Sequence, residues 1–222
     1  MDGNKIKVAF LSEDFSRKGM GTALVIQKLA GQFIDNFSDK IELTLIRKEG
    51  ICGNPITKKI RNIEIKVYKT PFFSTVISYL LFFFNNRDKF DVVMFNRNVY
   101  PGFWMLNAKV FILFLHDASV SPVYEEKLTL ENKLFYFFLK YIGKYFLDAI
   151  IAVSDDARNG VMSRLNVSPS KVFSVYNGVN ENFRKFSNQE KSEAELFLDK
   201  KYKIRPPYIL DVSRLDPHKN IH

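Results

Sequence analysis

The sequence is poor in cysteine, because Cys52 is the only one among its 222 residues. A single cysteine cannot form an internal disulfide, and it cannot supply the several thiolates of a cysteine zinc site. Disulfides are typical of exported proteins, whereas free thiols are typical of reducing compartments. We therefore expect this protein to reside in the cytoplasm.

Long hydrophobic runs are lacking as well. The longest apolar stretch, from Phe72 to Phe84, is interrupted by two serines and a threonine, and it is shorter than the roughly 18 to 20 residues that span a bilayer. The first residues lead directly into an apolar run, without the apolar core and small-residue cleavage site of a signal peptide. These absences predict a protein that does not cross a membrane, although it could lie on the surface of one.

Positive charge and phenylalanine, by contrast, are plentiful. The chain has 33 Lys and Arg against 24 Asp and Glu, which gives a net charge of +9, and it has 22 Phe. This balance favours an anionic partner, whether lipid, phosphate or nucleic acid. Because no motif of a nucleic-acid-binding module is visible, we expect no nucleic acid partner.

Two aromatic clusters, at 72–84 and 135–138, allow two interpretations. Most economically their rings belong to the core. Alternatively, some rings are exposed and, with basic neighbours, suit the headgroup zone of an anionic membrane on the inner face of the plasma membrane. The basic neighbours are Arg87, Lys89, Lys133, Lys140 and Lys144.

Short apolar runs alternate with longer segments of helical periodicity along most of the chain. The predicted strands are 6–11, 41–46, 63–67, 91–95, 109–115, 149–153 and 171–175, and the predicted helices are 23–37, 71–84, 128–146 and 155–165. Strands that are apolar on both faces and alternate with helices are typical of a parallel sheet covered on both sides. The sequence therefore predicts an α/β fold, a Rossmann-like, doubly wound parallel sheet.

The composition changes after Phe183 to a charged stretch that is poor in large apolar residues. Such a stretch is typical of a connecting segment. A fresh apolar run, 208–212, follows Pro206 and Pro207. We thus predict an N-terminal domain over 1–183, a linker over 184–207, and the first strand and loop of a truncated second domain over 208–222.

Ligands of doubly wound sheets bind beyond the carboxyl ends of the strands, so the loops that follow the strands hold the candidate residues. After the first run come Gly19, Gly21 and Thr22, where the backbone can approach an anion at a helix N-terminus. The alternative is a plain turn with Thr22 as the helix N-cap. Because a third spaced glycine is missing, a nicotinamide-dependent oxidoreductase is disfavoured.

Further candidates follow later strands, and each has a purely structural alternative. His116 could hydrogen-bond a sugar hydroxyl or serve only its own turn, and Asp117 follows it. We expect Ser154 to act mainly as a helix N-cap. The pair Asn177–Gly178 is typical of a tight turn with positive φ.

Two cations stand just beyond the last apolar run. Arg214 and Lys219 could clamp a diphosphate, Arg through its planar fork and Lys as a point charge. The alternative for each is a solvated basic turn. No residue set suggests a metal site.

In order along the chain, these segments resemble the retaining GT-B glycosyltransferases, a group that includes sucrose synthases, glycogen synthases and bacterial envelope mannosyltransferases. The resemblance covers nearly the whole chain. It is carried by residues 6–11 with the loop 19–22, and by 90–93, 115–117, 150–154, 175–179 and 212–220. Lys18, Ser213 and Asn180 depart from the family pattern, which usually has Gly, Gly and Asp there.

The resemblance implies two Rossmann-like domains that face a cleft, the N-terminal one holding the acceptor and the C-terminal one the nucleotide sugar. By matching position, the loop of Gly19, Gly21 and Thr22 would approach the donor phosphate or the acceptor. His116 would contact the transferred sugar as a catalytic residue. Arg214 and Lys219 would stabilise the leaving nucleoside diphosphate without a metal or other cofactor.

The expected reaction is transfer of a sugar, with retention, to a cell-envelope glycan or glycolipid. The family's pair of glutamates in the C-terminal domain is absent from this chain, so we expect an acceptor-side portion that is inactive alone. The alternative is a non-catalytic Rossmann-like binding module that docks on a membrane or a partner. Arg214 and Lys219 argue against such a self-contained module, because it would have no use for two cations that form only part of a diphosphate-binding site.

Overall fold

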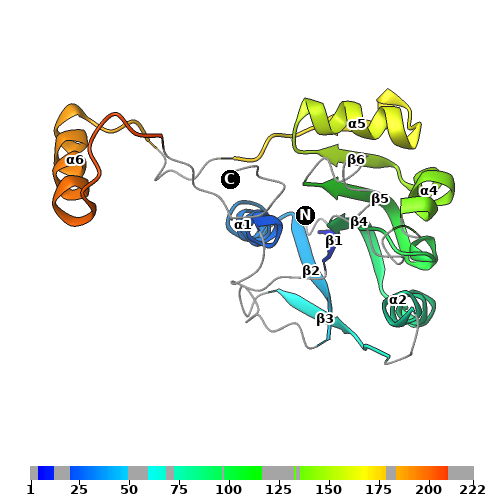
Figure 1. Ribbon diagram of the computed structural model, residues 1–222. Coiled ribbons are helices and arrows are strands. Elements are labelled where there is room, and N and C mark those ends of the chain that lie inside the picture. The colour runs from blue at the N-terminus through cyan, green and yellow to red at the C-terminus, as the bar shows by residue number, and fades with distance from the viewer. Residues whose placement is uncertain are drawn as a thin grey trace. The chain divides into compact units, whose positions relative to one another are not determined.

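A computed structural model (Figure 1) describes residues 5–12, 21–49, 60–68, 73–96, 98–116, 133, 136–178 and 184–209. The chain divides into two compact units, Met1–Asn177 and Gly178–His222. The predicted domain limits at 183 and 207 stay predictions.

The first unit is built on a sheet of seven strands that pair in parallel, in the order β3-β2-β1-β4-β5-β6-β7. This confirms the predicted α/β, Rossmann-like parallel sheet. The strands are β1 (Ile6–Leu11), β2 (Ile41–Lys48), β3 (Arg61–Ile65), β4 (Lys89–Asn96), β5 (Asn107–Leu115), β6 (Ala149–Ala152) and β7 (Val172–Ser174).

The strand order reverses at β1. After β1 the chain adds β2 and β3 on one side, and it then returns to place β4 against the other side of β1. Such a reversal opens a crevice beyond the carboxyl ends of the two central strands, where doubly wound sheets bind ligands. The structure thus puts the ends of β1 and β4 at this switch point.

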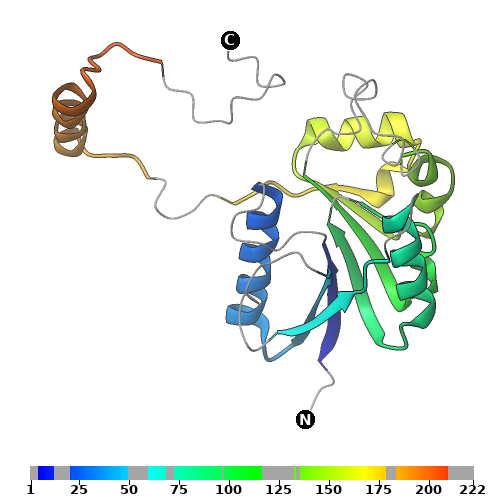
Figure 2. The ribbon, with the colours of Figure 1, turned by 60° about the horizontal axis from the view of Figure 1, so that its bottom comes forward.

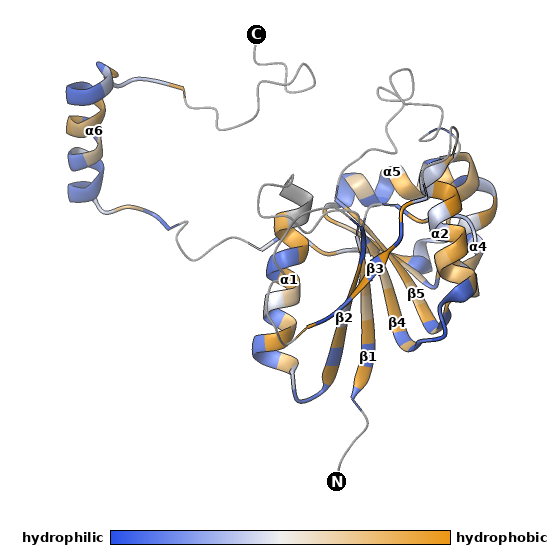
Figure 3. Ribbon diagram, turned by 90° about the horizontal axis from the view of Figure 1, so that it is seen from below, coloured by the Kyte–Doolittle hydropathy of each residue, from blue (hydrophilic) through white to orange (hydrophobic). Residues whose placement is uncertain are grey.

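Helices cover both faces of the sheet (Figures 1 and 2). Helix α1 (Gly21–Phe37) packs Ile26 and Ala30 over Val8 and Phe10 of β1. The other face is covered by α2 (Ser74–Asn85), the short helix η1 (Phe103–Met105), the π-helix η3 (Leu139–Gly143) with α4 (Lys144–Phe146), and α5 (Asp155–Leu165). Figure 3 shows the strands as mostly apolar between these two layers, as expected for strands buried on both faces.

Most predicted elements are confirmed with shifts of a few residues, and β1 and α5 have the predicted limits. The described end of the predicted helix 128–146 is not a continuous α-helix, because Leu139–Gly143 is a π-helix. A Cβ on Gly143 would lie 3.0 Å from the ring of Phe138, so this glycine leaves room for that buried ring. Residues 128–132 lie outside the described part of the chain.

The second unit contains a helix that the charged composition concealed. Helix α6 (Asn188–Tyr202) lies within the segment expected only to connect two domains. Ser187 and Glu190 form a capping box, and two guanidinium bonds from Arg184 help to lower the pKa of Glu190 to about 2. Of the predicted strand 208–212, only Tyr208 and Ile209 are described, and neither is in a strand.

Candidate functional site

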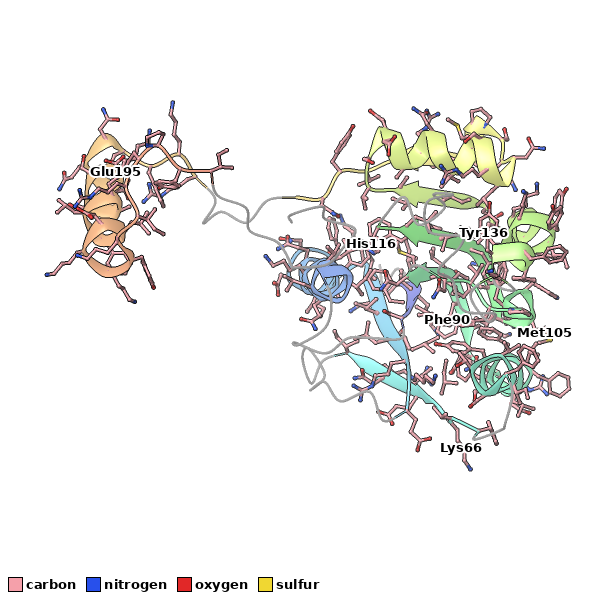
Figure 4. The ribbon with its side chains drawn as sticks, viewed as in Figure 1. Lys66, Phe90, Met105, His116, Tyr136 and Glu195 are labelled. Atoms are coloured by element: carbon pink, nitrogen blue, oxygen red, sulfur yellow. The ribbon has the colours of Figure 1, made fainter. Side chains whose placement is uncertain are left out.

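Three polar residues from neighbouring strands meet at the switch point. Ser12 directly follows β1, Asn96 ends β4, and His116 directly follows β5. Leu11 is paired with Phe95, and Asn96 with Phe114, so the parallel register brings these strand ends to one edge. In Figure 4 His116 lies at the arrowhead end of β5, away from Met105, which precedes that strand.

Hydrogen bonds join the three side chains into one network, which we call the Ser12–Asn96–His116 network. The amide nitrogen of Asn96 donates to Ser12 Oγ at 2.8 Å, and its carbonyl oxygen lies 2.6 Å from His116 Nε2. With Asn96 in this orientation the neutral imidazole carries its proton on Nε2. The network therefore sets both the tautomer and the direction of the ring.

The surroundings hold the network in place. Ser12 is only 2% exposed, and its backbone N–H donates to the carbonyl of Ile46 on β2 at 3.0 Å. The imidazole of His116 packs edge-on against the ring of Phe114, with the ring centres 4.5 Å apart. A preorganised polar group at a ligand-binding edge is suited to recognising a polar substrate.

Ser154 caps α5, as predicted. Its Oγ accepts the backbone N–H of Ala157 at 3.1 Å, and Asp155 and Asp156 occupy the first turn of the helix. Both features stabilise a helix N-terminus. A role of Ser154 in the cleft stays a prediction.

Asp155 also forms hydrogen bonds with the end of β7 and with the segment that follows it. Its carboxylate accepts hydrogen bonds from Ser174 Oγ at 2.5 Å and from the hydroxyl of Tyr176 at 2.8 Å. These bonds lower the pKa of Asp155 and raise that of Tyr176. This anchor was missed in the sequence, where the first-turn acid suggested only helix capping.

Two predictions for individual candidates are wrong. Asn177 and Gly178 are exposed, and neither has a positive φ, because glycine permits that conformation without requiring it. Thr22 is not the N-cap of its helix, since α1 already begins at Gly21.

Several predicted site residues lie outside the described residues, namely Gly19, Asp117, Arg214 and Lys219. Gly21 and Thr22 are described only as the first residues of α1. Their positions nevertheless place the start of a long helix after β1, at the switch point. Within the described residues, no three His, Cys, Asp or Glu side chains gather as they would to hold a metal ion.

The sequence did contain a signal for the two network residues that were missed. Ser12 and Asn96 are the first polar residues after the apolar runs 6–11 and 91–95. The missing information was strand order, because 84 residues separate the two along the chain.

Comparison with known proteins identifies relatives of this fold. The family described as Glycosyltransferase Family 4 matches residues 47–183. A comparison with curated proteins found no match.

Solved structures of Anabaena Alr3699/HepE are similar to the chain. The complex with UDP and glucose has a TM-score of 0.52 at 17% identity, and the complex with UDP has a TM-score of 0.52 at 16% identity. In both cases the comparison covers 87% of this chain and 50% of the Anabaena chain. The chain thus spans about half the length of the Anabaena protein.

Proposed function

The chain belongs to Glycosyltransferase Family 4, and we propose that it forms the acceptor-side half of an enzyme that moves a sugar from a nucleotide-sugar donor to an acceptor. The single observation that supports this most is the Ser12–Asn96–His116 network at the carboxyl ends of β1, β4 and β5. A preorganised polar network at a switch point is suited to binding hydroxyl-rich ligands.

His116 contacts the transferred sugar in this proposal. Asn96 holds its Nε2 proton and fixes the plane of the ring, so the imidazole meets the sugar in one tautomer and one direction. Fixed hydrogen-bonding groups aimed at a reacting centre lower a barrier because they need no reorganisation during the reaction. His116 is thus a catalytic residue, and Asn96 and Ser12 are positioning residues.

The donor phosphates bind at the start of α1 and at the loop before it. Helix α1 is 17 residues long and begins at Gly21, so its free N–H groups and positive dipole end favour an anion near Gly21 and Thr22. The family resemblance adds Gly19 to this loop and adds Arg214 and Lys219 as cations on the diphosphate. These cations would stabilise the leaving nucleoside diphosphate without a metal.

The finer features of the reaction rest on the resemblance. They are retention at the anomeric carbon, a cell-envelope glycan or glycolipid as acceptor, and the lack of transfer by residues 1–222 alone. Asp117, Ser154, Asn177 and Gly178 are further residues proposed for the cleft. UDP-glucose, which is bound in a structure of the similar Anabaena protein, is the first donor to test.

The experiment is a transfer assay with the complete gene product. It is incubated with radiolabelled UDP-glucose and a lipid and glycan extract, and both UDP release and labelled product are measured. We expect UDP release that depends on the extract, and retained anomeric configuration in the nuclear magnetic resonance spectrum of the product. Absence of transfer with UDP-glucose and with a panel of other nucleotide sugars would contradict the proposal.

A further inference from the structure

One flank of the first unit exposes an unusual number of aromatic side chains. Its rings come from α2, η1 and the segment that runs through η3 and α4, and we call the surface they form the aromatic face. Its members and their exposed fractions are Phe84 (65%), Trp104 (37%), Phe137 (57%), Tyr141 (53%), Tyr145 (71%) and Phe146 (42%). Single exposed rings need no explanation, but a group of six from adjacent elements does.

Contacts join these elements into one continuous surface. Trp104 stacks on Phe146 with ring centres 4.5 Å apart, and Phe137 lies 4.6 Å from Tyr141. On the other side of η1, a Cβ at Gly102 would lie 2.6 Å from the side chain of Leu80, so η1 packs directly against α2. Figures 1 and 3 both show α2 and α4 on the same flank of the sheet.

Buried neighbours hold two of the exposed rings, those of Trp104 and Phe146, in position. Phe103 contacts both Trp104 and Phe146, and Trp104 also stacks on the buried ring of Phe138 at 5.8 Å. Trp104 and Phe146 therefore lose little conformational freedom when a partner covers them.

The charge of the aromatic face has a single sign. Residues 73–85, 98–107 and 136–146 contain no Asp or Glu, and their charged residues are Lys140 and Lys144. The Lys140 ammonium lies 5.6 Å from the ring centre of Tyr141, and that of Lys144 lies 5.3 Å from Tyr145. Cations next to aromatic rings, in described segments that contain no acid, complement a negatively charged partner.

We propose that the aromatic face docks on the surface of an anionic lipid bilayer. Tyrosine and tryptophan combine an apolar ring with a polar group, which suits the boundary between headgroups and acyl chains, and lysines add attraction to anionic headgroups. A second copy of the same face is a poorer partner, because it would set lysines against lysines. Among the described helices, none is long and apolar enough to span a membrane.

This inference goes beyond the proposed transfer reaction and does not require it. Met105 of η1 and His116 lie at opposite ends of the sheet in Figure 4, so docking leaves the edge that bears His116 uncovered. Vesicle binding and sugar transfer can therefore fail independently of each other.

Vesicle flotation of the 222-residue chain is the test. Vesicles of phosphatidylcholine are compared with vesicles in which part of this lipid is replaced by phosphatidylglycerol, at low and at high salt. We expect binding to the anionic vesicles that weakens with salt. Lys140→Ala should weaken this binding about fivefold, whereas Lys28→Ala, which removes an equal charge from α1 on the other face, should not.

The rings are tested by Phe84→Ser and Tyr145→Ser, each of which should lower the partition coefficient about tenfold. Phe37→Ser is the matched control, because Phe37 is an exposed ring of α1. Circular dichroism shows whether each variant is folded. The salt dependence of the wild-type chain tests the proposal even if a variant fails to fold. Equal binding to neutral and anionic vesicles would overturn the proposal. It would also be overturned if the chain sedimented as a dimer that the same substitutions dissociate, or if it bound single-stranded RNA and not vesicles.

Discussion

The amino and carboxyl ends of the same sheet carry different chemistry. At the amino end, carboxylates accept hydrogen bonds from the strands themselves: Asp91 from the N–H of Lys7 at 2.8 Å, and Asp148 from the N–H of Phe111 at 2.8 Å. At the carboxyl end, the polar side chains of Ser12, Asn96 and His116 form hydrogen bonds with one another.

This difference separates stability from function. The acids at the amino end satisfy backbone donors and align neighbouring strands, so their removal leaves N–H groups without partners. The network at the carboxyl end fixes the direction of polar groups at the edge where we propose that the sugar binds. We therefore expect substitutions at the amino end to lower stability and those at the carboxyl end to lower activity.

The largest expected effect is that of His116→Ala in the complete gene product. Loss of a fixed contact to the reacting sugar should lower turnover about a hundredfold, while the melting temperature changes little. Initial rates per folded molecule, with the folded fraction taken from circular dichroism, check this. A variant that mainly unfolds and keeps its rate per folded molecule would show that His116 serves the fold.

Asn96→Ala should act through His116 and lower turnover about tenfold, as loss of an orienting hydrogen bond does. Because loss of the hydrogen bond to Nε2 changes the proton affinity of the imidazole, the dependence of kcat on pH should also shift. Asn96→Asp, which still offers an oxygen to Nε2, should restore part of the rate. Unchanged pH profiles in both variants would show that Asn96 does not position His116.

Asp148→Ala tests the amino end. It removes the acceptor for the N–H of Phe111 and should lower the free energy of unfolding by about 1 kcal/mol, with turnover unchanged per folded molecule. Urea unfolding gives the first quantity, and the transfer assay gives the second. A large loss of turnover at full stability would erase the distinction between the two ends.

The smallest effect concerns acid stability. Lys109, which lies 2.6 Å from Asp91, and the N–H of Lys7 lower the pKa of this carboxyl below 3.8. The stabilisation from Asp91 is therefore present above pH 3.8 and is lost as the pH falls below that value. Asp91→Asn should be slightly less stable than the wild type at neutral pH, and the difference should vanish in acid. If the urea midpoints of the wild type and Asp91→Asn differed by the same amount at neutral and at acid pH, the charge of Asp91 would not be the cause of the difference in stability.

The fold could be predicted from the sequence because its signals are local. Apolar runs bounded by polar residues define β1 and β5, and Ser154 with two acids after it marks the start of α5. Helix α6 was not predicted, because the charged composition of its segment drew attention away from the capping box of Ser187 and Glu190.

The candidate site could be predicted only in part. His116 stands out as a histidine at a strand end, but its partners depend on strand order. Asn96 and Ser12 are distant in sequence, and only the insertion of β1 between β2 and β4 brings them together. The π-helix at Leu139–Gly143 was likewise not indicated by any local pattern.

The most direct test of the central claim, that the sugar binds at the carboxyl end of the sheet, is a nuclear magnetic resonance titration of the complete gene product with UDP-glucose and, separately, with UDP. Imidazole signals of His116 and amide signals of Ser12 and Asn96 are followed together with those of Asp91 and Asp148. We predict that UDP-glucose shifts the signals of the Ser12–Asn96–His116 network and that UDP, which lacks the sugar, shifts that of His116 much less. Equal responses of His116 to both ligands, or shifts confined to Asp91 and Asp148, would contradict this claim.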